Sequence, residues 1–262
     1  ALAAILAGIE EAGVPVYVMP GNHDLYSSMA ARFSGDEIEL AESVTASEFA
    51  GIYAEFGFDE ALSRDAASLS YSVRLAPGLR LVMVDANTYS NPGWVAAGTL
   101  EWVEAQLIEA ESSGERVIAA SHQNLYAHSP LFMNGYMLGN SAQLEALYAE
   151  YGVIVNLSGH IHLQHIRAER NPPEIAGSSL AVSPNQYGVL TLGPGRAAYH
   201  TESVDAAAWA EREGTGDEEL LNFAEYSRGF FYDTAVAQGL AEAGARENAI
   251  ELAEYYAGVN TL

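Results

Sequence analysis

Three short polar motifs, far apart in the chain, each follow a run of apolar and partly β-branched residues. The runs span residues 14–19, 116–120 and 153–157, and such runs are typical of buried strands. Because α/β folds place their functional groups in loops at strand ends, we predict that the three motifs lie in such loops. The motifs are Gly21-Asn22-His23-Asp24, Ser121-His122-Gln123 and Gly159-His160-Ile161-His162.

The residue types in these motifs suit a metal ion. Asn22 offers a carbonyl oxygen, and His122 and His160 offer neutral imidazole nitrogens. Divalent ions of the Mn, Fe or Zn kind accept such a mixed nitrogen and oxygen set. We therefore predict that Asn22, His122 and His160 share one ion.

The order G-N-H-D, a lone His after a strand, and G-H-x-H resembles the calcineurin-like metallophosphoesterase superfamily over most of residues 14–200. The resemblance implies that Asn22, His122 and His160 bind one of two metals, and that His162 binds the other. It also implies that His23 is catalytic and faces the scissile phosphate, as a transition-state stabiliser or as proton donor to the leaving group. The expected cofactors are thus two divalent ions, Mn, Fe or Zn, which share a bridging hydroxide.

Three further stretches resemble a bacterial branch of this superfamily that carries a helical C-terminal domain. This resemblance implies a small phosphoester substrate, hydrolysis of phosphodiesters that include cyclic nucleotides, and an exported or envelope-associated protein rather than a cytoplasmic one. The stretches are residues 56–61, 68–71 and 122–129.

The chain departs from the superfamily at its start. The D-x-H and G-D motifs, whose Asp and His residues hold and bridge the ions, precede G-N-H-D in the family, whereas residues 1–20 contain no Asp. His162 is then the only residue of this chain that is expected to bind the second of the two ions. The chain also opens with Ala inside an amphipathic helical pattern, so we expect a truncated copy that is inactive or nearly so by itself.

Composition narrows the function classes. The net charge is −24 and every cation is an arginine, which argues against binding a nucleic-acid backbone and hence against a nuclease. No apolar run approaches the roughly 18 residues of a membrane-spanning helix. The chain has no cysteine, so disulfides and thiolate metal sites are excluded.

The pattern of elements predicts an α/β fold: a metallophosphoesterase-type sandwich of two mixed β-sheets flanked by helices. We expect a catalytic domain over residues 1–203 and a helical C-terminal region over residues 204–262, where no strand pattern remains. The expected helices begin at Thr45, Thr99 and Ser141, and Glu48, three residues after Thr45, completes a capping-box pattern for the first of them. The expected strands, beyond those before the three motifs, cover residues 69–75, 79–85, 165–168, 180–183, 189–192 and 197–200.

Some polar residues have a simpler interpretation. We assign His165 and His200 to structure, and we expect Asn124, Tyr126 and His128 near the substrate pocket without a role in metal binding. Polar residues that follow a strand commonly make turns, so a structural role is expected for Asp85, Asn87 and Asn91.

Two other functions stay open at this point. The first is a non-catalytic binding or scaffold protein on a phosphoesterase fold. The second is a structural zinc site made by His122, His160 and His162, which is disfavoured because structural zinc prefers cysteine. The substrate stays open among phosphomonoesters, phosphodiesters and phospholipid headgroups.

Overall fold

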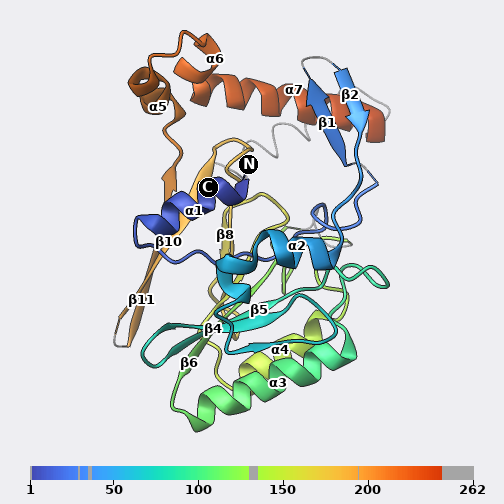
Figure 1. Cartoon of the computed structure of the whole chain (residues 1–262), viewed down its shortest axis with the longest axis vertical. Helices are drawn as coiled ribbons and strands as arrows, with labels where there is room; N and C mark the ends of the chain where they lie inside the picture. Colours follow the sequence, from blue (N-terminus) through green and yellow to red (C-terminus); the bar gives the residue numbers. More distant parts are fainter. Residues whose placement is uncertain (1, 29, 35–36, 130–134, 194, 244–262) are drawn as a thin grey trace. The chain divides into compact units, whose positions relative to one another are not determined.

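The computed structural model describes residues 2–28, 30–34, 37–129, 135–193 and 195–243 (Figure 1). The chain divides into two compact units, one of Ala1–His160 with Ile166–Ile175 and one of Ile161–His165 with Ala176–Leu262. This division differs from the domain boundary expected between residues 203 and 204. That boundary follows the change in composition and remains a prediction.

A seven-stranded sheet organises the first unit. Its central strands β5 (Leu79–Val84), β6 (Arg116–Ser121) and β7 (Asn156–Ser158) run parallel, and β3 (Ser63–Arg64) and β4 (Tyr71–Ala76) add to β5 in antiparallel fashion. Strands β9 (Glu174–Ala176) and β8 (His165–Arg167) follow β7 at the other edge. The mixed sheet with flanking helices confirms the predicted fold class.

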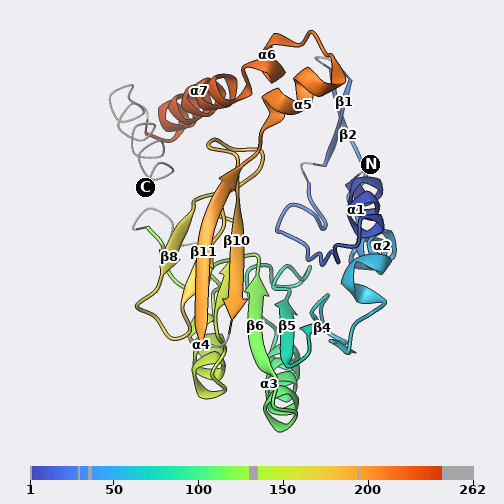
Figure 2. The ribbon, with the colours of Figure 1, turned by 90° about the vertical axis from the view of Figure 1, so that its left-hand side faces the viewer.

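Two helices, α3 (Ala97–Ser112) and α4 (Ser141–Glu150), lie against one face of this sheet (Figures 1 and 2). Alternate residues of each strand point to this face, which gives the core its regular spacing. Helix α3 begins at Ala97, two residues before the predicted Thr99. Ala96, in an extended conformation, is its N-cap residue. The core between the sheet and the helices contains Val82, Val84, Val117, Ala119, Val103, Leu107, Leu144 and Tyr148.

The segment formed by α2 (Ala46–Ile52) and the π-turn η1 (Ala54–Phe58) packs against β4. The predicted capping box is present, because Thr45 accepts from the backbone of Glu48 and the Glu48 carboxylate accepts from the backbone of Thr45. The ring of Phe58 lies 4.8 Å from the ring of Tyr71. Gly57, with a φ of 105°, lets the chain turn directly over that ring.

Residues 14–19, which we expected to form a buried strand, differ from the prediction. They have no regular secondary structure and join no strand ladder among the residues that the structure describes. Other contacts hold them: the Tyr71 hydroxyl donates to the carbonyl of Val18 at 2.7 Å, and the amide N–H of Val18 donates to the carbonyl of Phe56. The segment therefore leads into the first motif as an anchored loop. The preceding residues form helix α1 (Leu2–Glu11), as expected.

The strand expected over residues 180–183 is also wrong. The carbonyl of Val182 accepts from the amide of Asn185 in a turn, which removes it from any ladder. The strand of this region is instead β9 (Glu174–Ala176). The two prolines that precede it, Pro172 and Pro173, obscured its apolar strand pattern in the sequence.

The second unit contains the antiparallel pair β10 (Gln186–Gly193) and β11 (Arg196–Ser203), followed by helices α5 (Ala206–Glu213), α6 (Glu218–Leu221) and α7 (Phe223–Ala243). As predicted, no strand follows residue 203 within the described chain. Residues 244–262 of the predicted helical region lie outside the described residues. None of the helices in the described chain is both long and apolar enough to cross a membrane.

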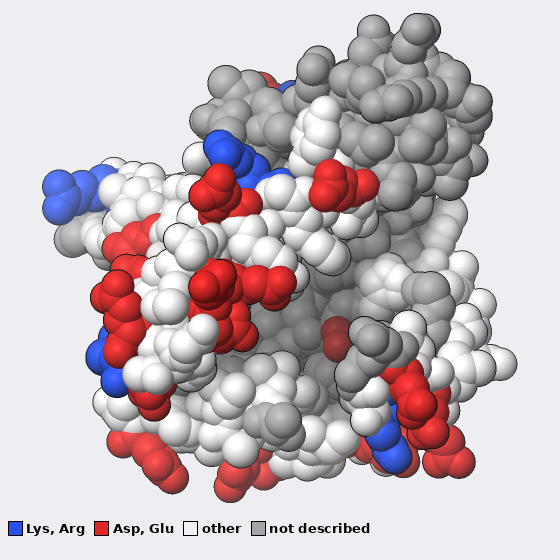
Figure 3. Space-filling model, turned by 90° about the horizontal axis from the view of Figure 1, so that it is seen from above, with Lys and Arg blue, Asp and Glu red and all other residues white. Residues whose placement is uncertain are grey.

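Among the charged residues of the sequence, acidic ones outnumber basic ones by 35 to 11. Figure 3 shows one face, on which Asp and Glu are spread widely with few arginines between them. A short hairpin, β1 (Ala31–Ser34) with β2 (Glu37–Leu40), adds to these exposed residues. This distribution fits the solvated acidic surface expected from the net charge of −24.

One buried ion pair stabilises the N-terminal end of β6. Arg80, with a side chain 1% exposed, lies 2.7 Å from the carboxylate of Glu115, and Arg74 bonds the same carboxylate. Burial alone would raise the pKa of Glu115, but the hydrogen bonds from Arg74 and Arg80 outweigh it and lower that pKa. A lowered pKa adds stability above about pH 4.3, the ordinary value for Glu, and this stability is lost as the pH falls.

We therefore predict that Glu115→Gln lowers the free energy of unfolding at pH 7 by about 3 kcal/mol, because Arg80 loses its buried partner. Urea unfolding between about pH 3 and pH 7 measures this. Stability should fall more steeply in acid for the unmodified chain than for the variant. Equal acid sensitivity of the two proteins would contradict the assignment.

Candidate metal centre

Three of the predicted ligands come together at one edge of the sheet. The Nε2 atom of His122 lies 2.9 Å from the Oδ1 atom of Asn22 and 3.2 Å from the Nδ1 atom of His160. The rings of the two histidines have their centroids 4.9 Å apart. Residues separated by 100 and by 38 positions in the chain thus place donor atoms within 3.2 Å of the Nε2 atom of His122.

Parallel strand pairing explains why the two histidines meet. Ser121 at the end of β6 pairs with Ser158 at the end of β7, so the loops that follow leave the sheet side by side. The amide N–H of Gly159 donates to the carbonyl of His122 at 3.0 Å, which links the loops directly. His122 and His160 therefore occupy adjacent positions beyond the sheet edge.

Gly21 lets the first motif approach His122 closely. A Cβ atom on Gly21 would lie 2.9 to 3.1 Å from three atoms of the His122 ring, a distance that real Cβ atoms rarely show. The Asp24 carboxylate accepts from the amide of Gly21 at 2.7 Å and closes the turn. As a result Asn22 faces His122, whereas His23 is exposed to solvent.

The third motif has an unusual backbone. His160 and His162 have φ angles of 63° and 56°, in the left-handed region that non-glycine residues seldom occupy. Such strain is found at functional sites, where surrounding contacts hold it. The Nε2 atom of His160 lies 3.1 Å from the carbonyl oxygen of Gly135. His162 is exposed and belongs to the second compact unit, so its assignment to the other metal remains a prediction.

The donor spacing suits a metal ion. Metal–ligand bonds of about 2.1 Å place neighbouring ligand atoms about 3.0 Å apart in an octahedron and about 3.4 Å apart in a tetrahedron. The observed separations of 2.9 and 3.2 Å match these edges. No cluster of three or more His, Cys, Asp or Glu residues suited to a metal occurs in the described part of the chain. The set is therefore two histidines and one asparagine.

Asn87 links two motif loops, a role that its sequence context did not indicate. The Nδ2 group of Asn87 donates to the carbonyl of Pro20 at 3.1 Å, and its Oδ1 atom accepts from the side-chain amide of Gln123 at 2.6 Å. Asn87 thereby ties the residue before Gly21 to the residue after His122. The available signal was its position: Asn87 follows β5, the third parallel strand, whose end lies at the same sheet edge.

Asp85 holds Asn87 in place. Its Oδ1 atom accepts from the amide of Asn87 at 2.7 Å, and its Oδ2 atom accepts from the amide of Leu69 at 3.0 Å. Burial raises the pKa of Asp85, and these two hydrogen bonds oppose the increase. Asp85 is thus a structural residue, as expected, but one that supports the site.

A cavity of about 560 Å³ opens between the residues after the first motif and those after β5. At its rim the rings of Tyr26 and Tyr89 meet edge to face with centroids 5.0 Å apart. Asn87 lines the cavity and also bonds Pro20 and Gln123 of the motif loops, whereas none of the predicted ligands lines it. Its other polar lining residues include Arg64, Asp65 and Asp85.

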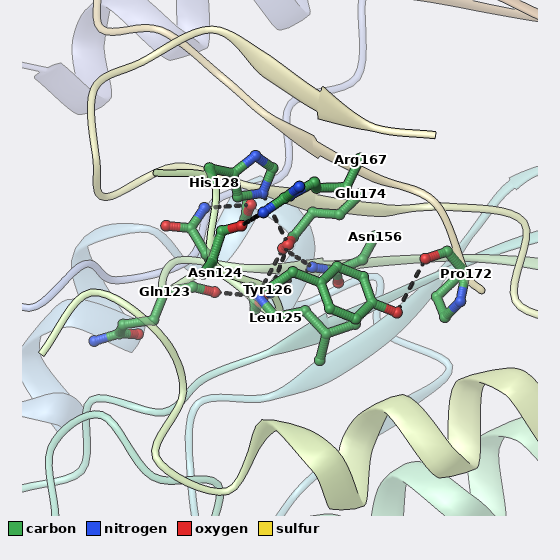
Figure 4. A network of polar contacts seen from close by, with 12 residues as sticks. Gln123, Asn124, Leu125, Tyr126, His128, Asn156, Arg167, Pro172 and Glu174 are labelled. Atoms are coloured by element: carbon green, nitrogen blue, oxygen red, sulfur yellow. Dashed lines mark hydrogen bonds and ion pairs between the residues drawn. The ribbon is translucent and has the colours of Figure 1, made fainter. Parts of the chain in front are cut away.

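Asn124, Tyr126 and His128, which we expected near a substrate pocket, do not line this cavity, and that expectation stays a prediction. All three are buried, with exposed fractions of 1%, 3% and 8%. They belong to the loop that follows His122 and take part in a polar network, drawn in Figure 4. Their alternation with apolar residues did not distinguish a buried network from a pocket wall.

A family pattern and a curated relative are similar to this chain. The calcineurin-like phosphoesterase family pattern matches residues 2–164. A curated relative, described as a probable cyclic nucleotide phosphodiesterase of Pseudoalteromonas sp. (strain SM9913), is 28% identical over 153 residues, which cover 56% of this chain and 44% of that protein. The chain therefore spans less than half the length of this relative.

A solved structure shows the same fold. A dimetal phosphatase from Danio rerio superimposes with a TM-score of 0.55 and 15% identity, over 77% of this chain and 74% of that one. The family match, the fold and the placement of the second and third motifs at strand ends lead to one conclusion: the chain belongs to the calcineurin-like phosphoesterase family.

Proposed function

We propose that the intact protein is a metal-dependent phosphoester hydrolase, and within that class a phosphodiesterase that accepts cyclic nucleotides. The convergence of Asn22, His122 and His160 is the observation that carries the proposal, because it leaves three donor atoms at metal-like spacing. The resemblance to a bacterial branch also supports export or envelope association, which we propose on that ground alone.

Each residue has a role in this proposal. Asn22, His122 and His160 would hold one divalent ion, and His162 would contribute to a second, with Mn, Fe or Zn as the candidates. When bound, such ions supply activation of water and stabilisation of phosphoryl charge. His23 is solvent-exposed beside Asn22, where it can stabilise developing charge or give a proton to the departing oxygen.

The cavity beside the first motif supports a diester substrate. Its volume of about 560 Å³ falls within the range of small-molecule sites and exceeds what a phosphate group needs. The tyrosines at its rim offer aromatic faces and edges to a planar group. A nucleoside moiety combines such a ring with polar groups, and the curated relative carries the description of a cyclic nucleotide phosphodiesterase.

The alternative is a non-catalytic binding or scaffold protein that keeps one metal or none on this fold. The small donor set of the described chain favours it. It predicts one bound ion or none and no turnover, whereas the enzyme needs two.

Metal content and turnover of the upstream-extended protein, loaded with Mn²⁺, test the two functions. We expect about two ions per chain and faster hydrolysis of bis-p-nitrophenyl phosphate than of p-nitrophenyl phosphate. Elemental analysis and release of p-nitrophenol provide the measurements. One ion or none, with both esters intact, would establish the binding protein instead.

Variants of two histidines separate catalysis from metal binding. His23→Ala should lower kcat by about a hundredfold, the typical effect of losing a general acid, and leave the metal content unchanged. His160→Gly should lose metal and turnover together, and glycine keeps the left-handed backbone allowed. The exposed His200→Ala serves as control. Equal metal retention in the first two variants would contradict the assigned roles.

Removal of an aromatic ring tests the cavity. Tyr89→Ala should raise the KM for cyclic AMP about tenfold, the order expected for losing one base-stacking contact. The KM for glycerophosphoethanolamine, a diester without a ring, should not change. Tyr187→Ala, at a partly exposed tyrosine of β10, provides the matched control. A similar increase for both substrates would argue against ring recognition at this rim.

A further inference from the structure

The carboxylate of Glu174 is fully buried and is saturated with hydrogen bonds. Its Oε1 atom accepts from the amide of Leu125 at 2.7 Å and from the Asn156 side chain at 2.8 Å. Its Oε2 atom accepts from the amide of Tyr126 at 2.8 Å and lies 3.0 Å from the Nε2 atom of His128. The residue is 0% exposed, and Figure 4 shows these groups converging on it.

These partners belong to the two segments that carry the predicted ligands. Leu125 and Tyr126 follow His122 by three and four residues, and Asn156 lies on β7, four residues before His160. Glu174 itself lies on β9, the neighbour of β7 in the sheet. One side chain thus bonds both the loop after β6 and the strand that leads to His160.

A second set of bonds ties the same segments to each other. The Asn124 side chain donates to the Ser158 hydroxyl at 2.8 Å, and the amide of Gly159 donates to the carbonyl of His122 at 3.0 Å. From residue 122 to residue 129 the loop after His122 has one isolated β-bridge, between Asn124 and Met137, and no helix or strand. Beyond that bridge, side-chain contacts such as these hold its conformation.

Burial of a carboxylate costs free energy of desolvation, and an apolar residue of similar volume would stabilise the fold as well or better. Stability alone therefore does not account for a carboxylate at this position. What a carboxylate provides is two oxygens that fix several N–H groups at defined positions. Residues that surround metal ligands without touching the metal commonly fix the positions of those ligands, since ligand atoms must be held close to their bound geometry.

We propose that Glu174 is a positioning residue for the metal site: it sets the separation between His122 and His160, and with it the affinity for the ion. This role rests on the proposed function, because it assumes that the two histidines hold a metal. Glu174 contacts neither the ion nor the substrate.

Glu174→Gln is a sharp test because the shape stays the same. An amide replaces one oxygen with an NH₂ donor, which then faces an N–H donor. If the NH₂ group takes the Oε1 position, the amide of Leu125 loses its acceptor; if it takes the Oε2 position, the amide of Tyr126 does. In either orientation the loop after His122 must shift.

Metal binding by the 262-residue chain is the readout. Titration with Co²⁺, followed by calorimetry and by visible absorption, reports both affinity and the ligand set. We expect Glu174→Gln to bind Co²⁺ about tenfold more weakly, the lower end of the effect of groups behind metal ligands, with an altered spectrum. Glu174→Asp, which keeps the carboxylate, should recover part of the affinity.

Glu115→Gln is the matched control. It removes a buried carboxylate at the opposite end of β6, so it should lower stability and leave Co²⁺ affinity unchanged. Unchanged Co²⁺ affinity in folded Glu174→Gln would overturn the positioning role, and so would an equal loss in Glu115→Gln.

Two further outcomes are informative. If Glu174→Gln does not fold, Asn124→Ala carries the test, because it removes one link between the same segments; wild-type affinity in that variant would overturn the proposal. If the unmodified chain binds no Co²⁺, the proposed function of these histidines fails, and the positioning role fails with it. Weak binding restricted to the Glu174 and Asn124 variants supports both.

Discussion

The parallel pairing of β5, β6 and β7 is the constraint on which the rest of the structure depends. Parallel neighbours end at the same edge of a sheet, so the residues after Val84, Ser121 and Ser158 must leave it together. This pairing brings His122 and His160 within hydrogen-bonding distance although 38 positions separate them. The helices α3 and α4 matter to the site because they bury the face that keeps these strands in register.

Polar contacts between loops refine what the sheet begins. Asn87 joins Pro20 to Gln123, and Glu174 joins the loop after His122 to β7. Loops without secondary structure need such bonds because their backbone groups would otherwise stay unsatisfied on burial. Glu115, a buried carboxylate with two arginine partners, lies at the other end of β6. Near the ligands, backbone amides and the Asn156 side chain donate to Glu174, and backbone amides donate to Asp85.

The donor set of Asn22, His122 and His160 is the basis of the functional proposal. Two histidines and one asparagine have the spacing of metal ligands, and the family match places them in a class of phosphoester hydrolases. A dinuclear centre needs further ligands, and the chain spans 44% of the curated relative's length. Phosphodiester hydrolysis is therefore a proposal for the intact protein, supported by the cavity beside Asn87.

The sequence by itself determined the motif residues, the α/β class, the capping box at Thr45 and the helical character of residues 206–243, because these follow from local patterns of spacing and residue type. Tertiary structure decided the rest. Residues 14–19 looked like a strand but find no ladder partner among the described residues, and β9 was hidden by neighbouring prolines. The roles of Asn87 and Glu174 depend on partners 36 to 67 and 18 to 49 positions away. Local sequence carries no information on such distant partners, which only the folded sheet brings together.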